Sequence, residues 1–130
     1  MRILVTGGAG FIGSFLVDEL IGRGHEVRVF DALLPQVHGD GGRPAYLSPK
    51  AELVHGDVRD REALGAALEG VEWVYHKAGA VGVGQSQYEI KHYVDVNIGG
   101  TANLLDLLVS STNQVRGLVV AASMSSYGEG

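Results

Sequence analysis

The sequence predicts an α/β fold in which helices cover both faces of a parallel β-sheet. Short apolar runs rich in valine and isoleucine alternate along the chain with longer stretches whose apolar residues recur every three or four positions. Runs such as residues 3–5 and 118–120 are apolar at every position, which is typical of strands buried on both faces. The 130 residues suffice for one hydrophobic core. We therefore expect a single doubly wound α/β domain.

The periodicity places each expected element. Apolar runs predict strands over residues 3–5, 27–30, 53–54, 71–75 and 118–121. Helical spacing predicts helices over residues 11–23, 59–68 and 88–109. Asp57 is a candidate N-cap for the second helix and Gly70 ends it, while Gly100 is expected to let the third helix approach the sheet closely. Residues 34–50 keep no period and are rich in Pro and Gly, which predicts a surface loop.

Composition and charge exclude several classes of function. The chain has 10 Lys and Arg against 15 Asp and Glu, a net charge of -5, and no basic cluster, so nucleic acids and anionic membranes are not expected partners. It has no cysteine, and its five histidines are scattered, so no metal site is expected. The first apolar run is too short for a signal peptide, and no run approaches the roughly 20 residues of a membrane span. We expect a cytoplasmic protein.

A glycine-rich loop follows the first expected strand. Gly8, Gly10 and Gly13 fit the pattern G-x-G-x-x-G, and Gly7, Gly10 and Gly13 fit the related G-x-x-G-x-x-G. Because the loop leaves a strand and opens a helix, its backbone can approach a pyrophosphate at the positive end of that helix. A tight turn without a ligand is the alternative. A P-loop is excluded, since no Lys followed by Ser or Thr closes the loop. The loop predicts a Rossmann-type dinucleotide site.

Asp31 is the expected partner of this loop. It follows the second expected strand, close to the roughly 20 residues expected after the glycine motif. A carboxylate there accepts hydrogen bonds from both ribose hydroxyls and repels a 2′-phosphate, and Ala32 follows it where an arginine would favour NADP. An aspartate that only forms a turn is the alternative. Together, the loop and the carboxylate predict NAD as the cofactor.

Five motifs in one order extend over the whole chain. They are TGGAGFIG at 6–13, HGDVRD at 55–60, HKAGAVG at 76–82, DVNIGGTANLL at 95–105 and AASMSSYGEG at 121–130. In these motifs the chain resembles the extended short-chain dehydrogenase/reductases, especially the nucleotide-sugar epimerases and dehydratases. The resemblance implies a Rossmann-type sheet of about five strands in the order 3-2-1-4-5.

The resemblance also implies a role for each residue that matches a family motif. The implied cofactor contacts are Gly7, Gly10, Phe11, Ile12 and Gly13 in the loop, Asp31, Asp57 and Val58 at the adenosine, and Ala78, Gly79 and Ala80 along the pyrophosphate and nicotinamide ribose. Asn97 is also assigned to the cofactor site, as the asparagine that braces the active-site backbone. Ser123 matches the catalytic serine or threonine, and Ser125 a residue of the substrate pocket. By residue type alone, Asp57 is also an N-cap candidate, and one Asp can serve both roles. For Ser123, residue type alone favours a turn or a cap.

Lys77 departs from the family pattern, in which an apolar or aromatic residue is usual at this position. Two interpretations are open. A lysine at the surface is the simpler one, and a contact to a phosphate group of a bound ligand is the other.

The catalytic base of the family is missing from these residues. Family members carry a Tyr and a Lys in a Y-x-x-x-K pattern downstream of the serine. The match from Tyr46 to Lys50 precedes Ser123 and contains Pro49, which does not suit the required helix. Tyr127 has no partner, because the sequence stops at 130. We expect residues 1–130 to be the incomplete N-terminal NAD-binding domain of a longer enzyme, truncated before the final strands and the substrate domain. Alone it should be inactive, with its fifth strand an exposed sheet edge.

The expected function follows from the resemblance. It implies the NAD-binding part of an NDP-sugar epimerase or dehydratase that oxidises and re-reduces a sugar by hydride transfer. A nucleotide-sugar is the implied substrate and a homodimer the implied assembly of the full-length enzyme. The missing base leaves open a non-catalytic NAD(P)-binding sensor or interaction module. A purely structural segment with an empty glycine loop is a third interpretation.

Overall fold

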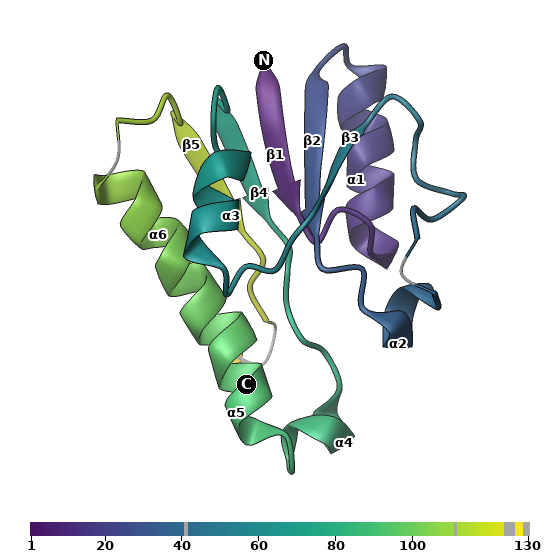
Figure 1. The fold of residues 1–130 in the computed structure, drawn as a ribbon, viewed down its shortest axis with the longest axis vertical. Helices are drawn as coiled ribbons and strands as arrows, with labels where there is room; N and C mark the ends of the chain where they lie inside the picture. Colours follow the sequence, from purple (N-terminus) through teal and green to yellow (C-terminus); the bar gives the residue numbers. More distant parts are fainter. Residues whose placement is uncertain (41, 111, 124–126, 129–130) are drawn as a thin grey trace.

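Five parallel strands form one sheet in the computed structural model, which describes residues 1–40, 42–110, 112–123 and 127–128 (Figure 1). The strands are β1 (Arg2–Thr6), β2 (Glu26–Asp31), β3 (Glu52–His55), β4 (Trp73–His76) and β5 (Gly117–Val120). Their order is β3-β2-β1-β4-β5, and every neighbouring pair is parallel. The strand order implied by the sequence is confirmed.

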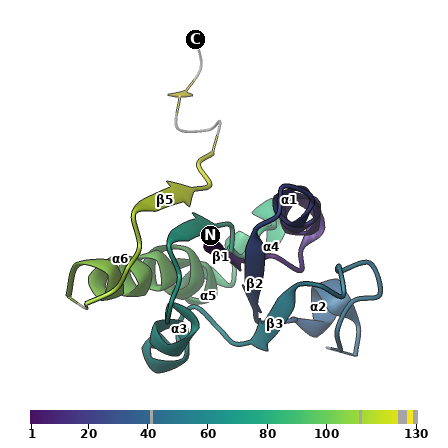
Figure 2. The ribbon, with the colours of Figure 1, turned by 90° about the horizontal axis from the view of Figure 1, so that it is seen from above.

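Helices cover both faces of this sheet. They are α1 (Phe11–Gly22), α2 (Pro35–His38), α3 (Arg61–Ala67), α4 (Val83–Ser86), α5 (Ile90–Tyr93), the π-helix η1 (Val94–Gly99) and α6 (Gly100–Ser110). In Figure 2, α1 lies on one side of the sheet, whereas α3 and α6 lie on the other. The doubly wound arrangement predicted from the alternating pattern is confirmed.

β1 lies at the centre of the hydrophobic core because its side chains alternate between two clusters. Ile3 and Val5 pack with residues of α1, whereas Leu4 packs with residues of α3 and α6 on the opposite face. All three side chains are almost completely buried. The apolar run over residues 3–5 is therefore a strand buried on both faces, as predicted. The strands point downward in Figure 1, so their carboxyl ends share the edge near α2 and α4.

β4 begins later than the predicted strand over residues 71–75. Gly70 has a φ of 70° and closes a turn in which the Val71 N–H donates to the Leu68 carbonyl at 3.1 Å. Val71 is fully buried in the core, but it belongs to this turn. An apolar run does not distinguish a buried turn residue from the first residue of a strand.

The N-terminus of α3 corrects the N-cap prediction for Asp57. The residue that caps the helix is Asp60, whose side chain accepts hydrogen bonds from the N–H groups of Glu62 and Ala63 at 3.1 and 3.0 Å. The Asp57 carboxylate binds the side chain of Arg59 instead. Two aspartates stand close together before this helix, and their spacing did not show which one caps it.

The helix predicted over residues 88–109 is divided. α5, η1 and α6 follow one another without a break from Ile90 to Ser110, but η1 has π-helical hydrogen bonding, which closes a wider turn than an α-helix. α4 is a separate turn before them. The apolar period of the sequence does not mark the change from one helix type to the other.

The segment over residues 34–50 is a loop, as predicted, but it contains the single turn α2. Pro35 stands at the start of that turn, where its missing N–H removes no helical hydrogen bond. Leu47 is buried in the core cluster on the α1 side of the sheet. The C-terminal part of this segment is therefore packed into the hydrophobic core.

β5 forms one edge of the sheet, as predicted, and pairs with β4. Leu118 packs against the cluster beneath α3 and α6, but Val119 and Val120 remain 42% and 45% exposed. Among the described residues no helix covers the α1 side of the sheet at β5 (Figure 2). The prediction that residues 118–120 are buried on both faces is therefore wrong. Within the described part of the chain, no helix has the length and apolarity to cross a membrane.

Candidate cofactor-binding site

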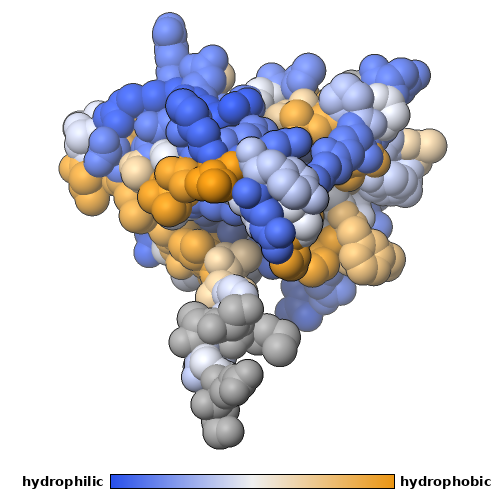
Figure 3. Space-filling model, turned by 90° about the horizontal axis from the view of Figure 1, so that it is seen from below, coloured by the Kyte–Doolittle hydropathy of each residue, from blue (hydrophilic) through white to orange (hydrophobic). Residues whose placement is uncertain are grey.

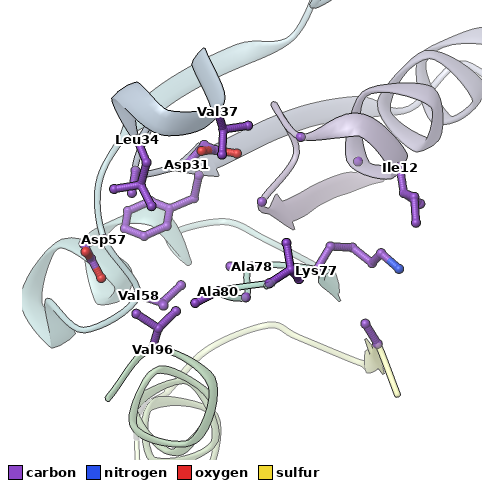
Figure 4. A pocket seen from close by; sticks show the side chains of 18 of the residues that line it. Ile12, Asp31, Leu34, Val37, Asp57, Val58, Lys77, Ala78, Ala80 and Val96 are labelled. Carbon is purple, nitrogen blue, oxygen red and sulfur yellow. The ribbon is translucent and has the colours of Figure 1, made fainter. Parts of the chain in front are cut away.

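A cavity of about 570 Å³ opens at the edge where the strands end. Figure 3 views this edge of the molecule, where apolar side chains (orange) are exposed among hydrophilic ones (blue). The cavity is lined by the glycine loop, the start of α1, the end of β2, α2, and the segments after β3, β4 and β5 (Figure 4). The predicted residues among its lining are Gly7, Gly10, Phe11, Ile12, Gly13, Asp31, Asp57, Val58, Ala78, Gly79 and Ala80. The fold thus brings together segments from all five sequence motifs.

The glycine loop is packed so closely that at two of its positions a side chain would collide with backbone atoms. Gly7 has a φ of 68°, and a Cβ atom on it would lie 2.7 Å from the Ala78 backbone nitrogen. A Cβ atom on Gly13 would lie 2.2 Å from the carbonyl oxygen of Gly7. Gly10 is the N-cap of α1 and offers no side chain to occupy the first N–H groups of the helix. These N–H groups and the helix dipole suit an anion at this end of α1.

Asp31 ends β2 with its side chain only 11% exposed. Its Oδ2 accepts a hydrogen bond from the Ala9 N–H at 2.9 Å, and its Oδ1 accepts one from the Leu33 N–H at 3.0 Å. Each carboxylate oxygen has a second lone pair, so both remain able to accept from a hydroxyl. The two backbone N–H groups therefore fix the carboxylate against the glycine loop, and both carboxylate oxygens can still accept a further hydrogen bond.

Asp57 lies in the loop after β3, at the cavity wall in Figure 4. Hydrogen bonds from the Arg59 side chain hold the pKa of the Asp57 carboxyl below its ordinary value, so it is ionised at neutral pH. The neighbouring Val58 packs against Gly100, where a Cβ atom would lie 2.4 Å from Val58 Cγ2. The close approach predicted for Gly100 is thus to this loop and not to a strand.

Asn97 holds the backbone of the segment after β4. Its Oδ1 accepts from the Ala80 N–H at 2.7 Å, and its Nδ2 donates to the Ala80 carbonyl at 3.0 Å. Ala78, Gly79 and Ala80 line the cavity, whereas Asn97 is not part of the lining. Asn97 therefore supports the cavity wall from outside.

Replacing Asn97 with Leu removes both hydrogen bonds without changing the net charge. We expect NAD affinity to fall about tenfold, since the segment around Ala80 loses its support. Isothermal titration calorimetry measures the loss. Asn97→Asp keeps the acceptor for the Ala80 N–H and should retain part of the affinity, and wild-type affinity in Asn97→Leu would contradict the supporting role.

A hydrogen-bond chain that is buried at His76 and Thr6 joins this segment to the centre of the sheet. The Thr101 hydroxyl donates to the Asn97 carbonyl at 2.7 Å, so its oxygen accepts from Nε2–H of His76 at 3.0 Å. Nδ1 of His76 then accepts from the Thr6 hydroxyl at 2.7 Å, and that hydroxyl accepts from the Lys77 and Ala78 N–H groups at 3.2 Å. Burial lowers the pKa of His76, which keeps the imidazole neutral, as this chain requires.

The lowered pKa of His76 predicts a loss of stability in acid. An unfolded histidine titrates near about 6.5, above the folded value, so the unfolded chain takes up the proton first and stability falls as pH drops below that value. We expect the free energy of unfolding to decrease more in the wild type than in His76→Gln between about pH 7.5 and about pH 5.5. Urea denaturation of both proteins measures this, and equal slopes would contradict it.

Several lining residues escaped prediction. They are Phe30, Ala32, Leu34, Val37, His38, Gly56, Val81, His92, Val96, Ala121 and Ala122. Lys77, for which a phosphate contact was one of two interpretations, also lines the cavity. Leu34, Val37 and His38 come from the segment without a period, and only their closeness to Asp31 in the sequence could have indicated them. In Figure 4, the Lys77 side chain extends along the cavity toward Ile12. The described residues contain no group of three or more His, Asp or Glu that could hold a metal ion.

The structure describes one of the two predicted serines. Ser123 follows the lining residues Ala121 and Ala122 and is exposed, but it is not part of the lining. Ser125 lies outside the described residues. Tyr46 and Lys50 do not share a helix, so the structure gives no support to that pair as a catalytic base, in line with its rejection from the sequence.

The comparison with known proteins decides the family. The model of the NAD-dependent epimerase/dehydratase family matches residues 3–130. The chain belongs to this family. The resemblance seen in the motifs is therefore confirmed, and the family uses NAD, as predicted.

Relatives with different substrates share this region. The dTDP-L-rhamnose 4-epimerase of Burkholderia thailandensis is 41% identical over 131 residues, 99% of this chain and 36% of that protein. The 3 beta-hydroxysteroid dehydrogenase/Delta 5-->4-isomerase of Mycobacterium tuberculosis is 39% identical over 80% of this chain and 27% of that protein. The crystal structure of UDP-glucose 4-epimerase from Brucella ovis in complex with NAD matches with a TM-score of 0.83 and 31% identity, over 98% of this chain and 37% of that one. The chain thus spans about a third of the length of these relatives.

Proposed function

We propose that this chain is the NAD-binding Rossmann domain of an enzyme that oxidises the sugar of a nucleotide-sugar and reduces it again, as in 4-epimerisation. The observation that carries the proposal is the arrangement of Asp31 beside the glycine loop, at one end of a cavity that also contains the segment after β4. The 4-epimerases among its relatives support the reaction class.

The residues present fit NAD. The first N–H groups of α1 suit the pyrophosphate, and the glycine loop leaves its approach open. The carboxylate of Asp31 would accept from the adenosine ribose, while Asp57 and Val58, which line the same cavity, would contact the adenine. Small residues 78–80 let the nicotinamide ribose approach the backbone. When bound, NAD supplies the hydride acceptor and donor.

The remaining roles concern the substrate. We assign to Ser123 the hydrogen bond to the reacting hydroxyl or carbonyl, and to Ser125 a place in the substrate pocket, as the family motif implies. We assign to Lys77, whose side chain extends along the cavity, a contact with a phosphate group. Because residues 1–130 contain no Tyr and Lys pair in a helical Y-x-x-x-K pattern after Ser123, they should bind NAD without turnover.

We also propose a cellular location and an oligomeric state for the enzyme. The absence of cysteine fits the reducing cytoplasm. Family resemblance supports a homodimer for the full-length enzyme. The cofactor supplies hydride transfer, and the substrate contacts that distinguish epimerisation, dehydration and isomerisation lie elsewhere, so the cofactor domain alone favours none of them.

Calorimetric titration of the chain with NAD tests the cofactor role directly. We expect a Kd below about 1 mM for NAD, weaker binding of NADP, and no change in absorbance at the wavelength of reduced NAD on adding UDP-glucose or dTDP-rhamnose. No NAD binding at any accessible concentration would contradict the proposal.

A steroid-oxidising enzyme is the second candidate, because the mycobacterial relative is nearly as similar as the rhamnose epimerase. Both candidates require NAD binding, so the substrate must be tested on a longer protein that contains this chain. Turnover of a nucleotide-sugar supports the first candidate, and turnover of a 3-hydroxysteroid supports the second. NAD binding without turnover of either would favour a sensor.

A further inference from the structure

The segment over residues 34–50 is tied to the glycine loop and to Asp31 by two side chains. The hydroxyl of Tyr46 donates to the Ala9 carbonyl at 2.7 Å. The imidazole of His38 lies between Tyr46 and Asp31, with Nδ1 at 3.3 Å from the Tyr46 oxygen and Nε2 at 3.7 Å from Asp31 Oδ1. Because the Ala9 N–H donates to Asp31 Oδ2 at 2.9 Å, the four residues form a closed ring of contacts.

The donor and the acceptor of the hydrogen bonds in this ring of contacts can be assigned. Tyr46 gives its one hydroxyl hydrogen to Ala9, so its oxygen can only accept from Nδ1–H of His38. Asp31 also accepts only. Both nitrogen atoms of the imidazole therefore face acceptors. The hydrogen bond from Nδ1–H to the Tyr46 oxygen holds the imidazole in place, with Nε2 in contact with Asp31 Oδ1 at 3.7 Å, which is too long for a hydrogen bond.

Two members of this ring of contacts, His38 and Asp31, form part of the cavity wall. The side chains of His38 and Asp31 are only 3% and 11% exposed, and both residues line the cavity. In Figure 4, Asp31 lies beside Val37 of α2, at the end of the cavity away from Ile12. The adenosine ribose belongs at this end if Asp31 accepts from its hydroxyls.

We propose that His38 and Tyr46 are positioning residues that set the preference of this chain for NAD over NADP through Asp31. This proposal rests on NAD binding at the site described above. Asp31 excludes a 2′-phosphate only while its carboxylate stays where the ribose 2′-oxygen arrives. To admit the phosphate, the carboxylate must leave its two backbone donors and turn aside. The imidazole occupies the space next to Oδ1, and the Tyr46 hydroxyl fixes the imidazole.

The ratio of the Kd for NADP to the Kd for NAD tests the proposal, measured by calorimetry on the full chain. We expect this ratio to fall about tenfold in His38→Ala and about threefold in Tyr46→Phe, which removes only the hydroxyl. Gln36→Ala is the matched control, because Gln36 lies on the same helical turn, bonds outward to Gln85 and does not line the cavity. Its ratio should equal that of the wild type.

A double-mutant cycle shows whether the effect passes through Asp31. In an Asp31→Asn background, His38→Ala should leave the ratio unchanged. Wild-type ratios in both His38→Ala and Tyr46→Phe would overturn the proposal. An equal loss of affinity for NAD and for NADP would also overturn it, since a merely structural role would weaken the binding of both cofactors alike. A wild-type chain that binds no NAD would instead overturn the proposed function, and this inference with it.

Discussion

Gly13→Ala is expected to abolish measurable NAD binding and to destabilise the domain. The added Cβ would lie 2.2 Å from the Gly7 carbonyl oxygen and 2.8 Å from Gly8 Cα, and both are backbone atoms that no rotamer change can move. The loop must therefore shift, at a cost of about 1–3 kcal/mol in the free energy of unfolding. Because the same loop forms the pyrophosphate site, we expect a loss of more than about a hundredfold in NAD affinity. Urea denaturation and calorimetry measure the two effects.

Substitutions at two other glycines distinguish the effect on stability from the effect on NAD binding. Gly22→Ala is the matched control, since a Cβ there meets nothing within 4 Å, and both stability and binding should be kept. Gly10→Ala meets only the Gly7 carbonyl, at 3.4 Å, yet Gly10 lines the cavity. It should therefore weaken NAD binding with little loss of stability. If Gly13→Ala bound NAD with wild-type affinity, the glycine loop would not be part of the NAD site.

Asp31→Ala is expected to weaken NAD binding by about a hundredfold and to remove the discrimination against NADP. The substitution deletes the acceptors of the ribose hydroxyls and the charge that repels a 2′-phosphate. It also leaves the Ala9 and Leu33 N–H groups without their carboxylate partner, so the free energy of unfolding should fall by about 1–3 kcal/mol. Titration with each cofactor and urea denaturation measure these changes.

The control for Asp31 is Asp18→Ala, which removes the same charge from an exposed position of α1 outside the cavity. Its affinities for NAD and NADP should match those of the wild type. If Asp31→Ala binds NAD as well as this control does, the empty-loop interpretation of the sequence becomes the better one.

Much of the fold could be predicted because periodicity reports burial directly. Residues 3–5 are apolar without alternation, and the strand that contains them is buried on both faces. The glycine loop and Asp31 were found because their chemistry fixes both residue type and spacing, and the structure places them together. Asp57 and Ala78 came from the family motif alone, and the fold brings both to the same cavity.

The rest depends on tertiary contacts that leave no local pattern. Val71 is as apolar as a strand residue but is buried in a turn. Asp57 and Asp60 are equally good N-caps by type, and only the path of the chain selects Asp60. His38 and Tyr46 reach the glycine loop from a segment without a period, so nothing in the sequence connected them with Ala9.

The π-helical segment Val94–Gly99 has a consequence for which insertions and deletions the domain can accept. Deleting Ile98 or Gly99 from it would permit an ordinary α-helix, and the helix would survive. Relative to α6, however, each residue before the deletion would turn by about 100°. Asn97 would then no longer face Ala80, while Thr101 would keep its place opposite His76. The number of residues in this helix is thus set by the loop it supports, and homologues that retain Asn97 should carry no gap between it and Thr101.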